Sequence, residues 1–344
     1  MSEQKKRTTI HDIARELGLT GSTVSRALSD HPRISATTKA LVRKKAQELN
    51  YRHNALASTL RTGKSNSIGV VIPRINRHFF ANLIHGIEQV CAEAGFHLLI
   101  CQSLESNEKE RAVLKTLLNS RVDGILVSLS AESEQTDHLK AIANQGVPVV
   151  LVDRITHGME HPSVTNEDFQ TCYDLTSHLV RQGCHRLVHF GGPAHLESYD
   201  QRYKGFQKAL EEAGLTEFQQ LSPILTDEEG YRQTKQLFQQ DPTPDAIVSA
   251  SDYSAQGAFR ALQELGIEIP GDVALSGYAN EPFTTLIHPQ MTSVELFPEQ
   301  MGKEAAGMLL DLINHASGTE PARNRIQPVI HFRASTQKSP DGNS

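Results

Sequence analysis

The chain has 344 residues, of which 38% are hydrophobic and 22% charged, so its composition excludes a disordered or fibrous protein. No apolar run reaches the roughly eighteen residues of a membrane helix, and the start, MSEQKKRTTI, has no apolar segment typical of a secretory signal. We therefore expect a cytoplasmic protein that makes no membrane contact. The four cysteines match no metal or disulfide spacing and are expected to be free thiols: Cys91, Cys101, Cys172 and Cys184.

Positive charge is concentrated at one end of the chain. Residues 1–66 hold 13 Lys or Arg against 5 Asp or Glu, whereas residues 67–344 hold 21 against 35. This asymmetry predicts that the first segment binds a polyanion and that the remainder does not. A solvated basic tail is the alternative.

The tail alternative fails because the segment is patterned as two short helices joined by a tight turn. The apolar residues of the first helix recur at i, i+3, i+4 and i+7: Ile10, Ile13, Ala14 and Leu17. Thr9 is a plausible N-cap, with Asp12 three residues later. Gly18 can take the left-handed conformation that ends a helix, and Thr20 can cap a second helix that begins at Gly21.

The second helix is expected to carry short polar side chains on its outer face. Four residues share that face: Ser22, Ser25, Arg26 and Ser29. A helix in a DNA major groove needs small side chains, hydroxyl groups, and an arginine that can bind guanine with two hydrogen bonds. Thr20 and Thr23, at the helix start, suit phosphate contacts. A merely solvated serine-rich face is the alternative.

A third helix and a linker complete this segment. Ser35 is the expected N-cap of a helix through ATTKALVRKKAQELNY, which offers apolar residues for a small core: Leu41, Val42, Ala46 and Leu49. The next stretch, YRHNALASTLRTGKSNS, is polar and basic. At about nine residues, a helix within it is too short to form without a partner. We predict a three-helix segment over 1–52, a linker with a conditional helix over 53–66 and a core over 67–344.

The core sequence alternates short apolar runs with amphipathic helices. Strands are expected at 68–73, 97–103, 123–129, 148–153, 186–192, 245–251, 273–279 and 292–296. Nearly continuous Val, Ile and Leu runs between helices indicate parallel sheets that are covered on both faces, and the length allows two such sheets.

No constellation of catalytic residues is found in the sequence. The first expected strand lacks the following glycine-rich turn of a dinucleotide fold, and the HExxH and GxSxG motifs are absent. His185 and His189 flank a strand and are best explained as structural residues. We predict that the protein is not an enzyme and uses no metal or cofactor.

Several blocks of the sequence resemble the LacI/GalR family of transcriptional regulators. These blocks are TTIHDIARELGLTGSTVSRALSD, ELNYRHNALASTLRTGKSNSIGVVIP, RVDGILV, QRYKGFQKALEEAGL and IPGDVALSGYANEP. The resemblance implies an all-α helix-turn-helix headpiece, a hinge helix and a periplasmic-binding-protein-like core of two doubly wound α/β subdomains. By this resemblance, the N-subdomain covers about 67–167 and 296–322, and the C-subdomain about 168–295 and 323–340.

The resemblance also implies a function. It implies a homodimer, or a higher oligomer, that represses transcription from operator DNA under the control of a small-molecule effector, expected to be a carbohydrate or a derivative of one. A sugar-binding transport protein is the alternative, which the basic first segment and the absence of a signal peptide disfavour.

Carried over by position, the resemblance assigns DNA contacts. Gly21, Ser22 and Arg26 would read bases, with Ser29 on the same face. The phosphate contacts would be Thr9, Thr20, Thr23 and Ser25. Asn54 and Ala57 would bind DNA from the hinge, and Leu60 would be wedged into the minor groove. Packing between the two hinge helices of a dimer is the alternative role for Leu60.

The resemblance also assigns effector contacts, at strand ends that face a cleft. They are Phe79, Phe80, Asp153, Arg154, Arg202, Ser251 and Asp252. Two positions depart from the family pattern. Ala279 stands where the family often has an acidic residue, which leaves Asn280 or Glu281 as substitutes, and Leu225 stands where an aromatic residue is common.

Overall fold

The structure, a computed structural model, describes residues 8–51, 65–216, 218–221, 225–239, 243–314 and 322–338. Its internal contacts divide the chain into two units, Met1–Ser65 and Asn66–Ser344. We refer to these as the headpiece and the core. Every helix in the described ranges is too short or too polar to span a lipid bilayer. All four cysteines are free thiols, as expected.

The headpiece folds as the sequence predicts. Its described part contains α1 (Ile10–Leu17), α2 (Gly21–Leu28) and α3 (Ala36–Glu48). Thr9 and Asp12 form a complete capping box, Gly18 is left-handed with φ of 64°, and Thr20 and Ser35 cap α2 and α3 through their side chains. These caps satisfy backbone N–H groups that short helices would otherwise leave without partners.

A small apolar core holds the three headpiece helices together. It consists of Ile13, Ala14, Val24, Ala27, Val42 and Ala46. The prediction for Leu41 is wrong, because this side chain is 50% exposed. Val42, one position further along α3, is buried in the core instead, and the turn of about 100° per residue directs Leu41 toward solvent.

The strands of the core form two parallel sheets and one antiparallel pair within the described residues. Their bounds are β1 (Ser67–Ile72), β2 (His97–Gln102), β3 (Gly124–Val127), β4 (Val149–Val152), β5 (Ser163–Asn166), β6 (Leu187–Phe190), β7 (Gln219–Leu221), β8 (Ala246–Ser249), β9 (Ala274–Ser276), β10 (Ser293–Glu295), β11 (Arg323–Ile326) and β12 (Val329–His331). The sheet orders are β11-β5-β4-β3-β1-β2, β7-β6-β8-β9 and β10-β12. In the first sheet, Val70 of β1 pairs with Ile100 of β2 and Leu126 of β3.

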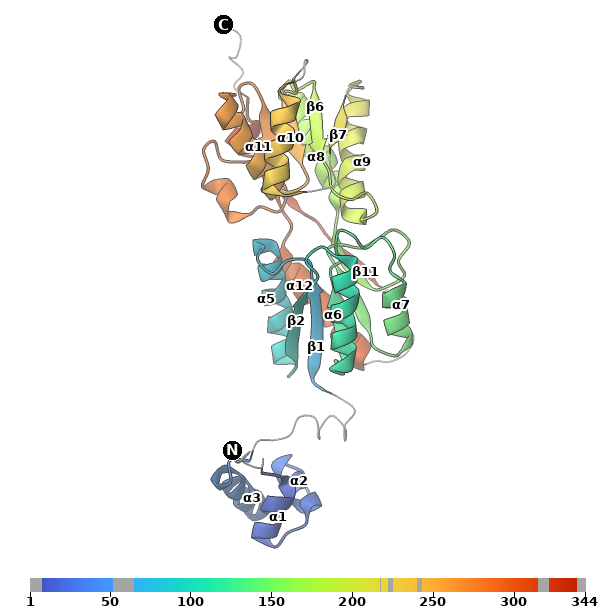
Figure 1. The fold of residues 1–344 in the computed structure, drawn as a ribbon, viewed down its shortest axis with the longest axis vertical. Helices are drawn as coiled ribbons and strands as arrows, with labels where there is room; N and C mark the ends of the chain where they lie inside the picture. The colour runs from blue at the N-terminus through green and yellow to red at the C-terminus, as the bar shows by residue number, and fades with distance from the viewer. Residues whose placement is uncertain are drawn as a thin grey trace, which may run out of the picture. The chain divides into compact units, whose positions relative to one another are not determined.

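Helices cover both faces of each large sheet. They are α5 (His78–Glu93), α6 (Asn107–Asn119), α7 (Asp137–Asn144), α8 (Asp168–Arg181), α9 (Glu197–Glu212), α10 (Asp227–Leu237), α11 (Asp252–Leu265) and α12 (Pro298–Asn314), with short 3-10 turns at Pro282–Thr285 and Ala334–Thr336. Figure 1 shows the core as two lobes, which we name the N-lobe, with α5, α6, α7 and α12, and the C-lobe, with α8 to α11. Both lobes therefore have the doubly wound α/β architecture that was expected.

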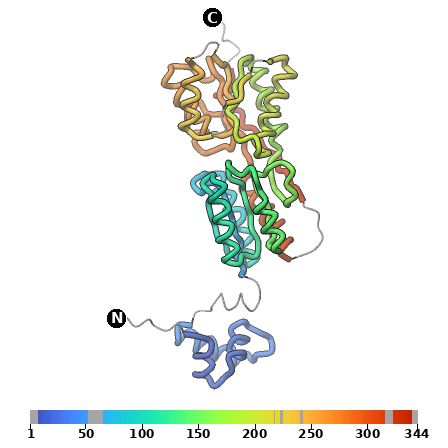
Figure 2. The backbone as a smooth tube through the Cα atoms, turned by 45° about the vertical axis from the view of Figure 1, so that its right-hand side comes forward, coloured from blue at the N-terminus to red at the C-terminus, as the bar shows by residue number. Residues whose placement is uncertain are grey.

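The chain passes between the lobes three times within the described residues. It leaves the N-lobe after β5, returns before α12, and leaves again between β11 and β12, and the β10-β12 pair joins the last two passages. Figure 2 shows the late segment, coloured red, returning beside the blue and green elements of the N-lobe.

One expected boundary between the subdomains differs from the structure. Residues 323–340 were assigned to the C-subdomain, but β11 (Arg323–Ile326) forms an edge strand of the N-lobe sheet, paired in parallel with β5. Its sequence, RNRI, has a single buried side chain, so the apolar pattern gave no sign of a strand. The passage to the C-lobe follows this strand.

Neighbouring helices in each lobe approach closely enough for backbone to touch backbone. A Cβ atom at Gly230 of α10 or Gly257 of α11 would collide with a carbonyl oxygen of the other helix. Gly86 of α5 and Gly302 of α12 make the same reciprocal contact. Because only glycine fits at these positions, each helix pair is fixed in a single register.

Candidate functional site

The outer face of α2 presents the polar side chains that the sequence singled out. Ser22, Arg26 and Ser29 are exposed and Ser25 is half-buried, whereas Val24 and Ala27 on the opposite face are completely buried. The Arg26 guanidinium forms no ion pair with any described residue, so its donors are available to a partner. An exposed cation on a helix bearing short side chains suits a base edge in a major groove.

Two of the threonines predicted to contact phosphate, Thr9 and Thr20, are the N-caps of α1 and α2. The Thr20 hydroxyl accepts a hydrogen bond from the Thr23 backbone N–H at 3.2 Å and lies 2.9 Å from the hydroxyls of both Ser22 and Thr23. Thr9 donates its hydroxyl to Asp12 at 2.7 Å. These bonds fix the starts of α1 and α2. Helix starts carry partial positive charge and favour phosphate nearby.

Gly21 has a steric role beside its predicted contact with a base. A Cβ atom at this position would lie 3.2 Å from the imidazole of His11. The glycine therefore lets α1 and α2 pack closely at the start of α2. The three hinge positions assigned to DNA, Asn54, Ala57 and Leu60, lie outside the described residues.

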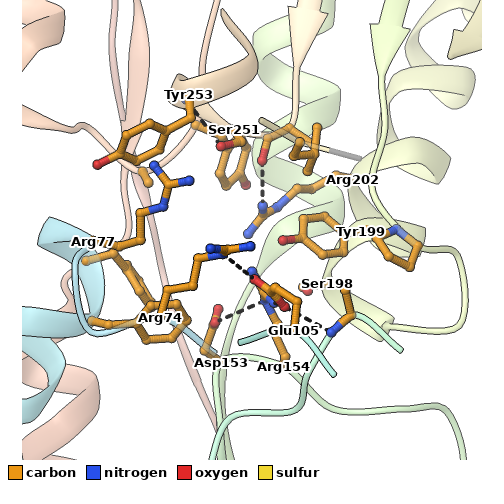
Figure 3. A pocket seen from close by; sticks show the side chains of 18 of the residues that line it. Arg74, Arg77, Glu105, Asp153, Arg154, Ser198, Tyr199, Arg202, Ser251 and Tyr253 are labelled. Atoms are coloured by element: carbon orange, nitrogen blue, oxygen red, sulfur yellow. Dashed lines mark hydrogen bonds and ion pairs between the residues drawn. The ribbon is translucent and has the colours of Figure 1, made fainter. Parts of the chain in front are cut away.

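A cavity of about 890 Å³ lies between the lobes of the core. Its walls come from loops that follow parallel strands of both sheets, including β1, β4, β6 and β8, and Figure 3 shows its charged and aromatic side chains converging. Ligands of open α/β sheets bind at these carboxyl ends of strands. The position and size are those of a small-molecule site.

The structure places most of the predicted effector contacts in the wall of this cavity. Six of the eight line it: Phe79, Phe80, Asp153, Arg154, Arg202 and Ser251. Phe79 and Phe80 pack edge to face, with ring centres 5.2 Å apart, and also belong to the hydrophobic core. The pair therefore supports the cavity wall as well as lining it.

Asp153 occupies an unusual position at the end of β4. It is a non-glycine residue in the left-handed region, with φ of 65°, and its side chain is buried. Such backbone conformations concentrate at ligand sites, where the surrounding fold enforces them. Ser128 donates a hydrogen bond to its carboxylate at 3.3 Å. Burial raises the pKa of Asp153 to about 6, which the guanidinium groups of Arg154 and Arg202 oppose.

Arg202 reaches the cavity from α9 and is held by a buried ion pair. Its Nε lies 2.8 Å from Oδ1 of Asp168, and its Nη1 donates to the Ala250 carbonyl at 3.0 Å. The Tyr278 hydroxyl donates to the same Asp168 oxygen at 3.0 Å. Burial raises the pKa of Asp168, and the Arg202 charge opposes that shift. These contacts orient the guanidinium rigidly.

Asp252 and Asn280 do not line this cavity. Asp252 is fully buried, where it accepts a hydrogen bond from the Ser293 hydroxyl at 2.6 Å and another from the Glu281 backbone N–H at 2.7 Å. Asn280 faces a second cavity of about 520 Å³ and bonds to Glu295. The structure brings Glu281, the other substitute, to the main cavity wall. We therefore leave Asp252 and Asn280 out of the proposed effector contacts.

Sequence reasoning missed several cavity residues. Arg74, Arg77 and Glu105 line the N-lobe side, and Tyr199 and Tyr253 line the C-lobe side. Phe79 and Phe80 were assigned from the family resemblance. Arg74 and Arg77 lie nearer to the end of β1, so the general rule that strand ends line a cleft would have indicated them. The tyrosines gave a weaker signal, because a single aromatic residue in a helix is also an ordinary core residue.

The cavity lining suits the binding of a small organic molecule. No cluster of His, Cys, Asp or Glu within the described ranges has the arrangement of a metal site. The lining combines aromatic faces, guanidinium groups and carboxylates. Aromatic faces hold apolar sides of a ligand, while charged groups hold its polar substituents.

Comparisons with known proteins cover nearly the whole chain. The family described as periplasmic binding proteins and sugar binding domain of LacI family matches residues 65–336, and the one described as bacterial regulatory proteins, lacI family, matches residues 9–54. The chain is 30% identical to the HTH-type transcriptional repressor PurR of Pasteurella multocida (strain Pm70) over 336 residues, which cover 96% of this chain and 98% of that protein.

Other relatives agree with this assignment. Catabolite control protein A of Priestia megaterium is 29% identical over 332 residues, covering 96% of this chain and 99% of that protein. The lac repressor dimer bound to operator and the anti-inducer ONPF shares the fold, with a TM-score of 0.84 at 22% identity, covering 97% of this chain and 100% of that one. The chain therefore belongs to the LacI family of bacterial regulatory proteins.

Proposed function

We propose that this DNA-binding transcriptional regulator is a cytoplasmic repressor, whose affinity for operator DNA is set by a small carbohydrate-type effector in the cavity between its lobes. The observation that carries the proposal is the exposed Ser22, Arg26 and Ser29 face of α2, opposite a fully buried apolar face. The relative from Pasteurella multocida is a transcriptional repressor by name, which supports repression.

The DNA-binding part of the proposal is tested by selecting duplexes from a random pool with the full-length protein. We expect an enriched pseudo-palindromic sequence, because a symmetric dimer presents two copies of α2. Binding to it should weaken steeply as salt rises, since neutralised phosphates release counterions. Selection without any enriched sequence, in the presence and absence of candidate metabolites, would contradict the proposal.

The effector part rests on the cavity and on the matched family, which is described as a sugar binding domain. An effector that bridges the lobes would change their relative orientation, because the walls come from both. By linkage it can alter operator affinity only through its different affinities for the two orientations, typically by about 1 to 3 kcal/mol. A sugar-binding transport protein would need no headpiece like this one, so the regulator is favoured over that alternative.

A homodimer is proposed from an edge strand with apolar side chains. β2 ends the N-lobe sheet, and its Leu99 and Ile100 are 39% and 42% exposed. An exposed apolar edge strand invites association unless something covers it. A second copy of the chain would cover it and would also provide the second headpiece that a symmetric operator requires.

Replacing both Leu99 and Ile100 with lysine is expected to convert the protein to a monomer. In a symmetric interface the lysines of one subunit lie close to those of the other and repel them. The substitutions also remove the apolar area that drives association. Light scattering coupled to size exclusion measures the mass, and the same sample should bind an operator with two half-sites far more weakly. Val329→Lys, at a similarly exposed apolar side chain of β12, is the control that should leave the dimer intact.

A further inference from the structure

Two arginines between β1 and α5 face the cavity, Arg74 with one long ion pair and Arg77 with none among the described residues. Arg74 and Arg77 are both drawn with their guanidinium groups directed inward (Figure 3). Arg74 comes no nearer to a carboxylate than 3.9 Å, from its Nε to Glu105, which is beyond hydrogen-bond distance. Arg77 forms no ion pair with any residue in the described ranges; its guanidinium lies over the Tyr253 ring, 3.4 Å from the centroid.

The other two arginines of the cavity are fully paired. Arg154 lies 2.8 Å from Glu105, and Arg202 lies 2.8 Å from Asp168. Glu105 also accepts the Ala131 backbone N–H at 3.0 Å through the oxygen that binds Arg154. Glu105 and Asp168 are therefore engaged with donors, and the cavity arginines without a short ion pair are Arg74 and Arg77.

The start of α5 adds to the positive charge at this wall. Arg77 is the N-cap residue of this 16-residue helix, and no side chain caps it. Unpaired N–H groups and the helix dipole favour negative charge at such an end. A pair of guanidinium groups beside it has the geometry that binds carboxylate or phosphate oxygens.

We propose that the effector carries an anionic oxygen group, either phosphate or carboxylate, which Arg74 and Arg77 bind from the N-lobe. This deepens the proposed function and rests on it, since it names the chemical class of the effector. The aromatic side chains that line the cavity remain available for the uncharged part of the molecule. Binding of the anion competes with the Arg77–Tyr253 stacking, which joins the two lobes in the structure.

The first test uses inorganic phosphate and the full-length protein. The Tm of the wild type should rise by about 3 °C in phosphate over chloride at equal ionic strength, because a ligand that binds only the folded state stabilises it. The R74Q/R77Q double variant should lose this rise. R232Q/R260Q, in which two surface arginines of α10 and α11 are changed, should keep it. All three proteins carry the same headpiece, so any rise in Tm caused by phosphate binding to the headpiece is the same in each.

An equal rise in the wild type and in R74Q/R77Q, or no rise in either, would overturn the anion site. Neither result affects operator binding, so the proposed function would stand. In the second test, sugars, their phosphates and their acids are added in matched sets to a gel shift with the selected operator. A charged member should change operator affinity at least tenfold more strongly than its neutral parent, and the phosphate and acid members distinguish the two anions.

A neutral sugar acting as strongly as its charged partners would overturn the proposal while confirming effector control. R77Q should lower the response to the charged member about tenfold, as expected for one lost charge-assisted hydrogen bond of roughly 1.4 kcal/mol. Absence of any selected operator would instead refute the proposed function, and the phosphate test would still decide whether the cavity binds anions.

Discussion

Replacing Arg202 with alanine is expected to lower the free energy of unfolding of the core by about 3 to 5 kcal/mol, the usual cost of leaving one member of a buried ion pair alone. Arg202 is only 5% exposed. Asp168 accepts hydrogen bonds from the side chains of Arg202 and Tyr278, and only the one from Tyr278 would remain in the variant. Differential scanning calorimetry should show a fall in Tm of about 10 °C. The same variant should bind operator when folded but lose its response to the effector, because Arg202 lines the cavity.

Two further variants distinguish the loss of stability caused by breaking the buried ion pair from the loss caused by removing any arginine. Arg232→Ala removes an exposed arginine from its pair with Glu229 and should change stability by less than about 1 kcal/mol. The double variant Arg202→Met with Asp168→Asn removes both charges and should be more stable than Arg202→Ala alone. An Arg202→Ala protein as stable as the Arg232→Ala control would refute the buried-pair argument, and one that still responded fully would refute the cavity role.

Replacing Arg26 with alanine is expected to relax base preference at one position of each operator half-site. A bidentate arginine contact with guanine discriminates against other bases by about 1 to 3 kcal/mol, or roughly 5-fold to 150-fold in affinity. The side chain is exposed on α2 and makes no ion pair with described residues, so the fold should be unaffected. Binding curves for single-base variants of the selected operator measure the change.

Arg15→Ala is the control for this experiment. Arg15 is an exposed arginine of α1 that pairs with Asp12, so removing it takes away one positive charge from the same unit. This variant should retain the base preference of the wild type, with at most a uniform loss of affinity. If Arg26→Ala and Arg15→Ala had the same preference profile, Arg26 would not be a base-reading residue.

The parts of the fold that the sequence predicted are those in which local pattern and tertiary structure agree. All eight apolar strands and the three headpiece helices with their caps are present. The missed strands are β5, β7, β11 and β12, which have three or four residues each and sequences such as SVTN and RNRI. Strands of this kind form because a neighbouring strand offers hydrogen bonds in register, which a hydrophobic pattern does not show.

The candidate cavity was predictable in outline but not in its charge balance. The family resemblance gave Phe79, Asp153 and Arg202, which all line the cavity, although Arg202 lies on α9 and not at a strand end. The pairing of Arg202 with Asp168 joins α9 to α8 and is separated by 34 positions along the chain, so no spacing rule reveals it. Which arginines are paired with a carboxylate depends on such long-range contacts, and the proposal of an anionic effector is based on them.

The glycines between paired helices limit how far a conformational change can rearrange the interior of a lobe. In each pair, carbonyl oxygens of one helix lie against glycines of the other. A shift of α5 along α12, or of α10 along α11, would bring these oxygens into collision with side chains. Each lobe is thus a stiff block that does not absorb a disturbance by internal rearrangement. We therefore expect a ligand bound at the strand ends to change the angle between the lobes, with the backbone changes falling in the three connecting segments.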